Sequence, residues 1–395
     1  MKFLVAWPNW GRRQDRGIMF SHLAEWIDEV YLISGVEPPP TMRAQMHPRC
    51  RVISVGEGVM SWRFAQAAYR WARTPLAQAA QKREHVLIQE MNIVRLVPMM
   101  LLTQPRNAKT NVRTVLSLYS PSAVFLRARG WRRQPEERLS WSQEQVHWRV
   151  QTSRVAREFI STQMVDAVTG NSDEIRDSVI RDYRKDPTKV FTIPTSIDTE
   201  FFRPAAYRGD GIPVILFLGR MLTRKGVFDL IGAAKVLRER GHVFKLRLIG
   251  ERDVEKMQVE KAVAESGLGE SIELIDWQPR EGVRDELQRA AMLVLPTYGE
   301  GSPRVVKEAM ACACPVVASD LPPIRSLNPR EEALTLFPVK NVTALADSME
   351  MLLRNADLRK QKGKWGRHLA EHSYSSAGIA RETYDIYSRL FQPEF

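Results

Sequence analysis

The chain has few cysteines and no apolar run of membrane-spanning length. Its three cysteines, Cys50, Cys312 and Cys314, form neither a Cys-x-x-Cys motif nor a cluster with histidine at metal-ligand spacing. We therefore expect no disulfide framework and a reducing compartment. The apolar stretch 92–102 is too short to cross a bilayer, and the first residues lack the order of a signal peptide. A P-loop for nucleotide hydrolysis is also missing.

Positive charge is concentrated in the first half of the chain. The formal net charge is +12, and residues 1–210 carry 31 Lys+Arg against 21 Asp+Glu, whereas the remainder is nearly balanced. Eight of the ten tryptophans also lie in the first half. Such an asymmetry indicates an anionic partner, either nucleic acid or acidic lipid.

Short β-type runs alternate with helical ones along the whole chain, which predicts an α/β fold built on parallel sheets. A length of 395 residues favours two domains, and the polar stretch 203–213 separates two such alternating series. We expect two doubly wound, Rossmann-like domains facing across a cleft, residues 1–205 and 206–373. A last helix is expected at about 374–392, and it resembles the final helix that, in two-domain folds of this kind, crosses back onto the first domain; the alternative is a simple packing helix.

The connection after the predicted strand 214–219 carries two cations, Arg220 and Lys225, just before a predicted helix. Backbone N–H groups at a helix N-terminus together with two cations form the outline of a diphosphate site. Taken alone, the two side chains could equally be solvated loop cations.

Two glutamates flank the loop after the predicted strand 292–296. Glu300 lies in the loop, and Glu308 lies just over one turn into a helix that is predicted to begin near Arg304, with Pro303 at its first position. Gly301 leaves room for a ligand, and carboxylates accept hydrogen bonds from neighbouring hydroxyls. The alternative is an ordinary helix N-terminus with Glu308 on the surface.

Three stretches together resemble a known family. They are LGRMLTRKG, the Glu-x7-Glu spacing within EGSPRVVKEAMACACPVVASD, and KVFTIPTSIDTEFFRP. They are similar to the retaining nucleotide-sugar glycosyltransferases of GT-B fold, glycosyltransferase family 4. The resemblance covers roughly 160–325 and is mostly architectural before residue 150. The N-terminal Gly-Gly loop of the family is replaced by RQDRGIMF, in which only Gly17 matches.

The resemblance implies a role for each matching position. Arg220 and Lys225 would bind the donor phosphates and stabilise the leaving diphosphate, Glu300 would contact the donor sugar, and Glu308 would hold the ribose. As catalytic residues it implies Glu300, Arg220 and Lys225. The donor-binding residues would be these three together with Gly17, Gln278, Gly301, Ser302, Pro303, Arg304, Val305 and Glu308. Trp277 would lie along the nucleotide base. The family uses no metal, and no Asp-x-Asp motif occurs here, so neither a metal nor another cofactor is expected.

The segment 124–159 combines arginines with Trp131, Trp141 and Trp148, as interfacial segments do at anionic lipid. The alternative is an amphipathic helix with buried tryptophans. Family members often act on lipid-linked acceptors, so we expect a cytoplasmic enzyme, peripheral at the inner face of the cell membrane. Nucleic acid is not expected as a partner, because no binding module is evident.

The sequence thus predicts a retaining glycosyltransferase, a hexosyltransferase of class EC 2.4. It would transfer a sugar from a nucleotide-sugar donor to a glycan or lipid-linked glycan acceptor in cell-surface polysaccharide or glycoconjugate biosynthesis. Two alternatives stay open: a non-catalytic nucleotide-sugar-binding or scaffold component of a polysaccharide complex, and a GT-B sugar epimerase.

Overall fold

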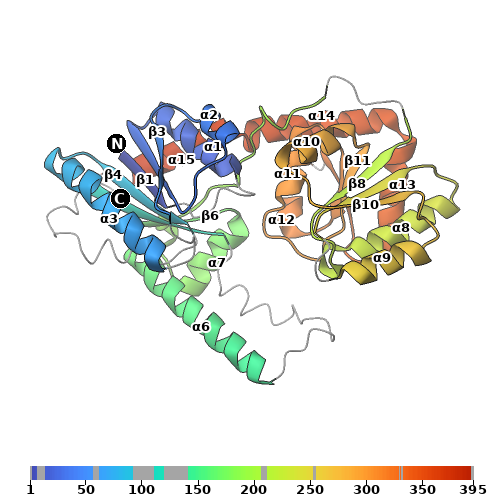
Figure 1. The fold of residues 1–395 in the computed structure, drawn as a ribbon, viewed down its shortest axis with the longest axis horizontal. Coiled ribbons are helices and arrows are strands. Elements are labelled where there is room, and N and C mark those ends of the chain that lie inside the picture. The colour runs from blue at the N-terminus through green and yellow to red at the C-terminus, as the bar shows by residue number, and fades with distance from the viewer. Residues whose placement is uncertain are drawn as a thin grey trace. The chain divides into compact units, whose positions relative to one another are not determined.

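A computed structural model describes residues 2–6, 14–56, 62–91, 111–119, 141–205, 211–251, 255–328, 330 and 332–392 (Figure 1). The chain divides into two compact units, one formed by Met1–Ser196 with Ile379–Phe395 and the other by Ile197–Gly378. The sequence predicts that the chain passes from the first domain to the second at 205/206 and returns near 374. Both predicted boundaries lie several residues from the observed ones. Residues 124–140 of the basic, tryptophan-rich segment 124–159, and the side chains of residues 141–151, lie outside the described part.

The first unit is built on one parallel sheet with strand order β3-β2-β1-β4-β5-β6-β7. The strands are β1 (Lys2–Ala6), β2 (Glu29–Ser34), β3 (Cys50–Ser54), β4 (Val86–Met91), β5 (Val112–Leu118), β6 (Ala167–Gly170) and β7 (Val190–Thr192). The helices are α1 (Gln14–His22), α2 (Pro40–Gln45), α3 (Trp62–Gln81), α6 (Trp141–Met164), α7 (Asp173–Tyr183) and α15 (Ser376–Arg389). In the described ranges these elements confirm the predicted alternation of β-type and helical runs.

Both faces of this sheet are covered, because successive strand residues point to opposite sides. Val86 and Ile88 of β4 join a core with α3 and α7, whereas Leu87 joins a second core with α1 and α15. Helix α15, red in Figure 1, thus belongs to the core of the first unit although it lies at the end of the chain. The buried Tyr387 hydroxyl on α15 donates a hydrogen bond to the Gln89 side chain of β4 at 2.7 Å.

The second unit holds a parallel sheet of order β10-β9-β8-β11-β12-β13. Its strands are β8 (Val214–Leu218), β9 (Lys245–Ile249), β10 (Ile272–Ile275), β11 (Met292–Leu295), β12 (Val316–Ser319) and β13 (Leu334–Phe337). Its helices are α8 (Val227–Glu239), α9 (Lys256–Glu265), α10 (Arg280–Arg289), α11 (Arg304–Ala311), α12 (Pro322–Arg325), α13 (Val342–Arg354) and α14 (Ala356–Ser373).

The order of this sheet reverses beside β8. Strand β8 pairs with β9 on one side and with β11 on the other, so that Leu216 lies opposite both Arg247 and Leu293. Ligands of doubly wound sheets bind outside the carboxyl ends of the strands at such a reversal. A ligand site is therefore expected at the connections after β8, β9 and β11.

Several details differ from the sequence prediction. Pro303 is the N-cap of α11, whereas the sequence predicts it as the first helical residue. Helices α12, α13 and α14 and strand β13 have no counterpart among the elements predicted from the sequence. No helix in the described ranges is long and apolar enough to cross a membrane.

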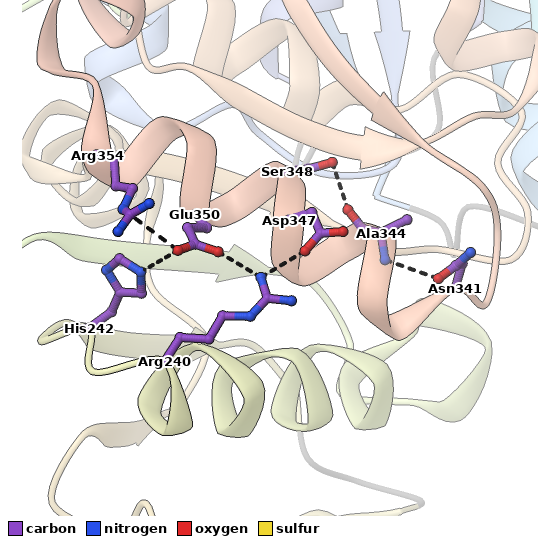
Figure 2. Close-up of polar contacts among 8 residues, drawn as sticks. All are labelled: Arg240, His242, Asn341, Ala344, Asp347, Ser348, Glu350 and Arg354. Atoms are coloured by element: carbon purple, nitrogen blue, oxygen red, sulfur yellow. Dashed lines mark hydrogen bonds and ion pairs between the residues drawn. The ribbon is translucent and has the colours of Figure 1, made fainter.

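A surface network joins α13 to the turn that follows α8 (Figure 2). The Glu350 carboxylate accepts hydrogen bonds from Arg240 at 2.6 Å and from the His242 ring at 2.8 Å, and Arg240 also donates to Asp347 at 2.7 Å. The Nε of Arg354 lies 3.6 Å from the same Glu350 oxygen that His242 contacts. These contacts surround the Glu350 carboxylate with hydrogen-bond donors, and the pKa of this carboxyl is lowered by its bonds to His242 and Arg240.

Candidate functional site

The predicted donor residues of the second unit gather at one edge of its sheet. Arg220 follows β8, Gln278 follows β10, and Glu300 follows β11. Because the strands are parallel, these connections all leave the sheet at its carboxyl edge. Residues separated by as many as eighty positions in the sequence are thereby brought to a common edge.

Lys225 and Glu300 form the most direct contact of the site. The Lys225 ammonium donates a short hydrogen bond to the Glu300 carboxylate, with 17% and 15% of the two side chains exposed. Lys225 ends a single 3-10 turn, Thr223–Lys225, and the next residue, Gly226, caps α8. The structure thus brings these two predicted residues into direct contact, and their role in a donor site stays a prediction.

Arg220 lies in the same connection but contacts a different carboxylate. Its Nε is 3.6 Å from Glu251, the second residue after β9, and both side chains are partly exposed. The backbone N–H of Met221 also donates to the Glu251 carbonyl, at 2.9 Å. The β8 and β9 connections are thus joined directly beside Arg220.

Glu308 lies in the second turn of α11 and pairs with Arg304 in the first turn at 3.0 Å, the usual i,i+4 spacing on a helix. Neither of these side chains is more than a quarter exposed. Gly301 is exposed, and a Cβ atom added to it would meet nothing within 4 Å, so the space beside the loop is open. The residues from Ser302 to Val305 lead from this loop into the helix.

The remaining predicted residues are less closely associated with this group. The Gln278 amide donates to the carbonyl of Asp276 in its own connection at 3.1 Å, and Trp277 beside it is 44% exposed. Gly17 is buried within α1 of the first unit rather than in a loop before it. A role for Gly17 in donor binding stays a prediction.

Sequence reasoning missed the residues that hold the connections in place. Glu255, at the start of α9, accepts two hydrogen bonds from Thr223. The Tyr298 hydroxyl donates to Asp229 in α8 at 3.0 Å, and burial together with this bond raises the pKa of Tyr298 to about 12. A search for polar residues just beyond every predicted strand would have found Glu251 and Tyr298, but not the pairing of Glu255 with Thr223.

Comparisons with known proteins show similarity in the second unit and in the overall fold. Residues 198–369, most of the second unit, match the family described as Glycosyl transferases group 1. Over the whole chain the structure is similar to that of the Anabaena protein Alr3699/HepE solved in complex with UDP-glucose. The TM-score is 0.67 at 14% identity, with 98% of this chain and 100% of that one covered. The fold is GT-B, with two Rossmann-like domains, and the second unit is similar to glycosyl transferases of group 1.

Two curated relatives are similar in sequence. The alpha-maltose-1-phosphate synthase of Mycolicibacterium smegmatis is 29% identical over 272 residues, which cover 63% of this chain and 70% of the relative. The amylovoran biosynthesis glycosyltransferase AmsK of Erwinia amylovora is 31% identical over 138 residues, or 33% of this chain and 34% of the relative. Both names describe enzymes that act on carbohydrates.

Proposed function

We propose that the protein transfers a sugar from a nucleotide-sugar donor to a glycan or lipid-linked glycan acceptor, with retention of anomeric configuration. The observation that carries this proposal is the pairing of Lys225 with Glu300, with Arg220 in the same connection as Lys225, at the carboxyl edge of the sheet in a unit that is similar to group 1 glycosyl transferases. A cation for phosphate and a carboxylate for sugar hydroxyls are the two groups that a nucleotide sugar requires side by side.

The chemistry follows from the charges. The anomeric C–O bond to the diphosphate breaks, its electron pair leaves with the phosphate oxygen, and positive charge develops on the sugar. Lys225 and Arg220 would stabilise the departing diphosphate, while Glu300 would hold the sugar hydroxyls near the developing positive charge. The acceptor hydroxyl then forms the new C–O bond on the face that the diphosphate leaves, and its proton passes to the departing diphosphate.

The other residues of the loop would bind the nucleotide. Glu308 would accept hydrogen bonds from the ribose hydroxyls, since a carboxylate can accept from two neighbouring hydroxyls at once. The free backbone N–H groups at the start of α11 suit phosphate or sugar oxygens. The two cations supply the charge that a metal supplies in other diphosphate sites, so we propose a reaction without metal or cofactor.

We further propose that the acceptor belongs to cell-surface polysaccharide or glycoconjugate synthesis, and that the protein works in the cytoplasm at the inner face of the membrane. The basic, tryptophan-rich composition of residues 124–159 supports contact with anionic lipid. The partial similarity to an enzyme named for amylovoran biosynthesis supports the polysaccharide assignment.

The deciding experiment is a donor screen followed by product analysis. The purified protein is offered UDP-, GDP-, ADP- and dTDP-sugars, with binding measured as a raised melting temperature and with Arg220→Ala and Glu308→Ala as comparison variants. We expect one nucleotide class to bind, which at 100 times its dissociation constant contributes about 2.7 kcal/mol to stability. NMR of the transferred sugar then tests retention. Binding without turnover on any glycan or lipid-linked acceptor would favour a non-catalytic role.

A further inference from the structure

The turn that carries Lys225 is bonded to Glu255, which lies in a neighbouring connection. The backbone N–H and the hydroxyl of Thr223, the first residue of the turn, both donate to the same Glu255 carboxylate oxygen, at 2.7 and 2.6 Å. Thr223 comes from the β8 connection and Glu255 from the β9 connection. Charge-assisted hydrogen bonds of this kind are shorter and stronger than neutral ones.

The opposite side of the turn is fixed as well. The Tyr298 N–H donates to the Arg224 carbonyl at 2.9 Å, and Pro296 lies against Gly226. The β11 connection, which carries Glu300, is thus bonded to the turn through its backbone. Within the turn, the Gly226 N–H donates to the Thr223 carbonyl at 2.8 Å, and the two bonds to Glu255 join Thr223 to the β9 connection.

A carboxylate near a diphosphate site has an electrostatic cost, because it repels an anionic ligand. Glu255 is half-buried, so water screens it only in part. The presence of Glu255 at this position is explained if fixing the turn contributes more to donor binding than the electrostatic repulsion costs. We propose that Glu255 is a positioning residue for the donor diphosphate, which fixes the Lys225 ammonium by holding Thr223; this role rests on the function proposed above.

The test compares nucleoside diphosphates with monophosphates. Isothermal titration measures the affinity of UDP, GDP, ADP or dTDP, whichever the wild-type protein binds, and of the matching monophosphate. Glu255→Ala should weaken diphosphate binding about 10-fold, because the two charge-assisted bonds that hold the turn of Lys225 are lost. Monophosphate binding should change little. Glu255→Gln should stay close to wild type, because its amide oxygen can accept both bonds from Thr223.

Two further variants keep the result interpretable. Thr223→Val removes only the hydroxyl bond and should give a smaller loss in the same direction. Glu265→Ala, on the exposed face of the same helix, should change nothing; its only ion pair described is with Lys261 at 3.6 Å. In a Lys225→Ala background, Glu255→Ala should have no additional effect on diphosphate affinity if it acts through Lys225.

The outcomes separate the two proposals. Additive losses in the double variant, equal losses for mono- and diphosphates, or tighter diphosphate binding by Glu255→Ala would each overturn the positioning role while leaving the donor site in place. Absence of binding by the wild-type protein to any of the four nucleoside diphosphates would overturn the proposed function, and the positioning role with it.

Discussion

The Lys225 ammonium and the Glu300 carboxylate are in contact although 75 residues separate them in the sequence. Each comes from a connection beside the reversal of the sheet, and each is mostly shielded from water. A cation and an anion that are removed from water together cost less than either would alone. A bound diphosphate would compete with Glu300 for Lys225, which leaves the carboxylate available to the sugar hydroxyls.

Replacing Lys225 by methionine should remove most of the activity while keeping the side-chain volume. Loss of one preorganised group at a developing charge lowers turnover by about 100-fold or more. The effect is measured as the initial rate of transfer from the donor that the screen identifies. Lys235→Met, on the exposed side of α8, is the matched control and should retain full activity. Wild-type turnover by the Lys225 variant would show that the leaving diphosphate binds elsewhere.

Replacing Glu308 by glutamine should weaken nucleotide binding and reduce the discrimination between ribose and 2′-deoxyribose. The wild-type protein should bind the ribonucleoside diphosphate more tightly than its 2′-deoxy analogue, because a charged hydrogen bond to a hydroxyl contributes about 1.5–3 kcal/mol. In Glu308→Gln the two affinities should approach one another. Equal discrimination in both proteins, measured by titration, would mean that Glu308 only pairs with Arg304.

The architecture was predictable because short β-type runs alternate regularly with longer helical runs. Strands such as β8 and β11 are buried on both faces and read as continuous apolar segments, which parallel sheets require. The Glu-x7-Glu spacing and the two cations after β8 then located the candidate donor residues. Glycine and proline at 301 and 303 marked where α11 begins, within one residue.

The partners of the site residues were not predictable in the same way. Which carboxylate meets Arg220 depends on the order of strands in the sheet, and Glu251 becomes its partner only because β9 lies next to β8. Likewise, the bonds from Thr223 to Glu255 join two connections whose lengths and paths the apolar pattern does not specify. Residues brought together by the order of a sheet leave no local signal in the sequence.

The network of Figure 2 predicts acid sensitivity of the second unit. The pKa of Glu350 is lowered below its usual 4.5 by hydrogen bonds from His242 and Arg240. A lowered pKa means that the contribution of the carboxylate is fully present above pH 4.5 and is lost as the pH falls through the folded-state value. The melting temperature of Glu350→Gln should therefore fall below that of wild type at pH 7, and the two should converge in acid. A difference that is constant with pH would exclude this linkage.

Replacing Gly226 by alanine should destabilise the second unit and disturb the turn that holds Lys225. Gly226 has φ of +73°, and a Cβ atom there would lie 1.9 Å from the Pro296 carbonyl oxygen, so the backbone of the β11 connection would have to move. Gly241→Ala is the matched control, because Gly241 has φ of +85° and nothing lies within 4 Å of its added Cβ. The control should cost about 1 kcal/mol for its left-handed backbone, and Gly226→Ala should cost about 3 kcal/mol or more, as measured by urea unfolding. Equal costs for the two variants would show that the β8 and β11 connections can separate freely, which would weaken the case for a preorganised Lys225.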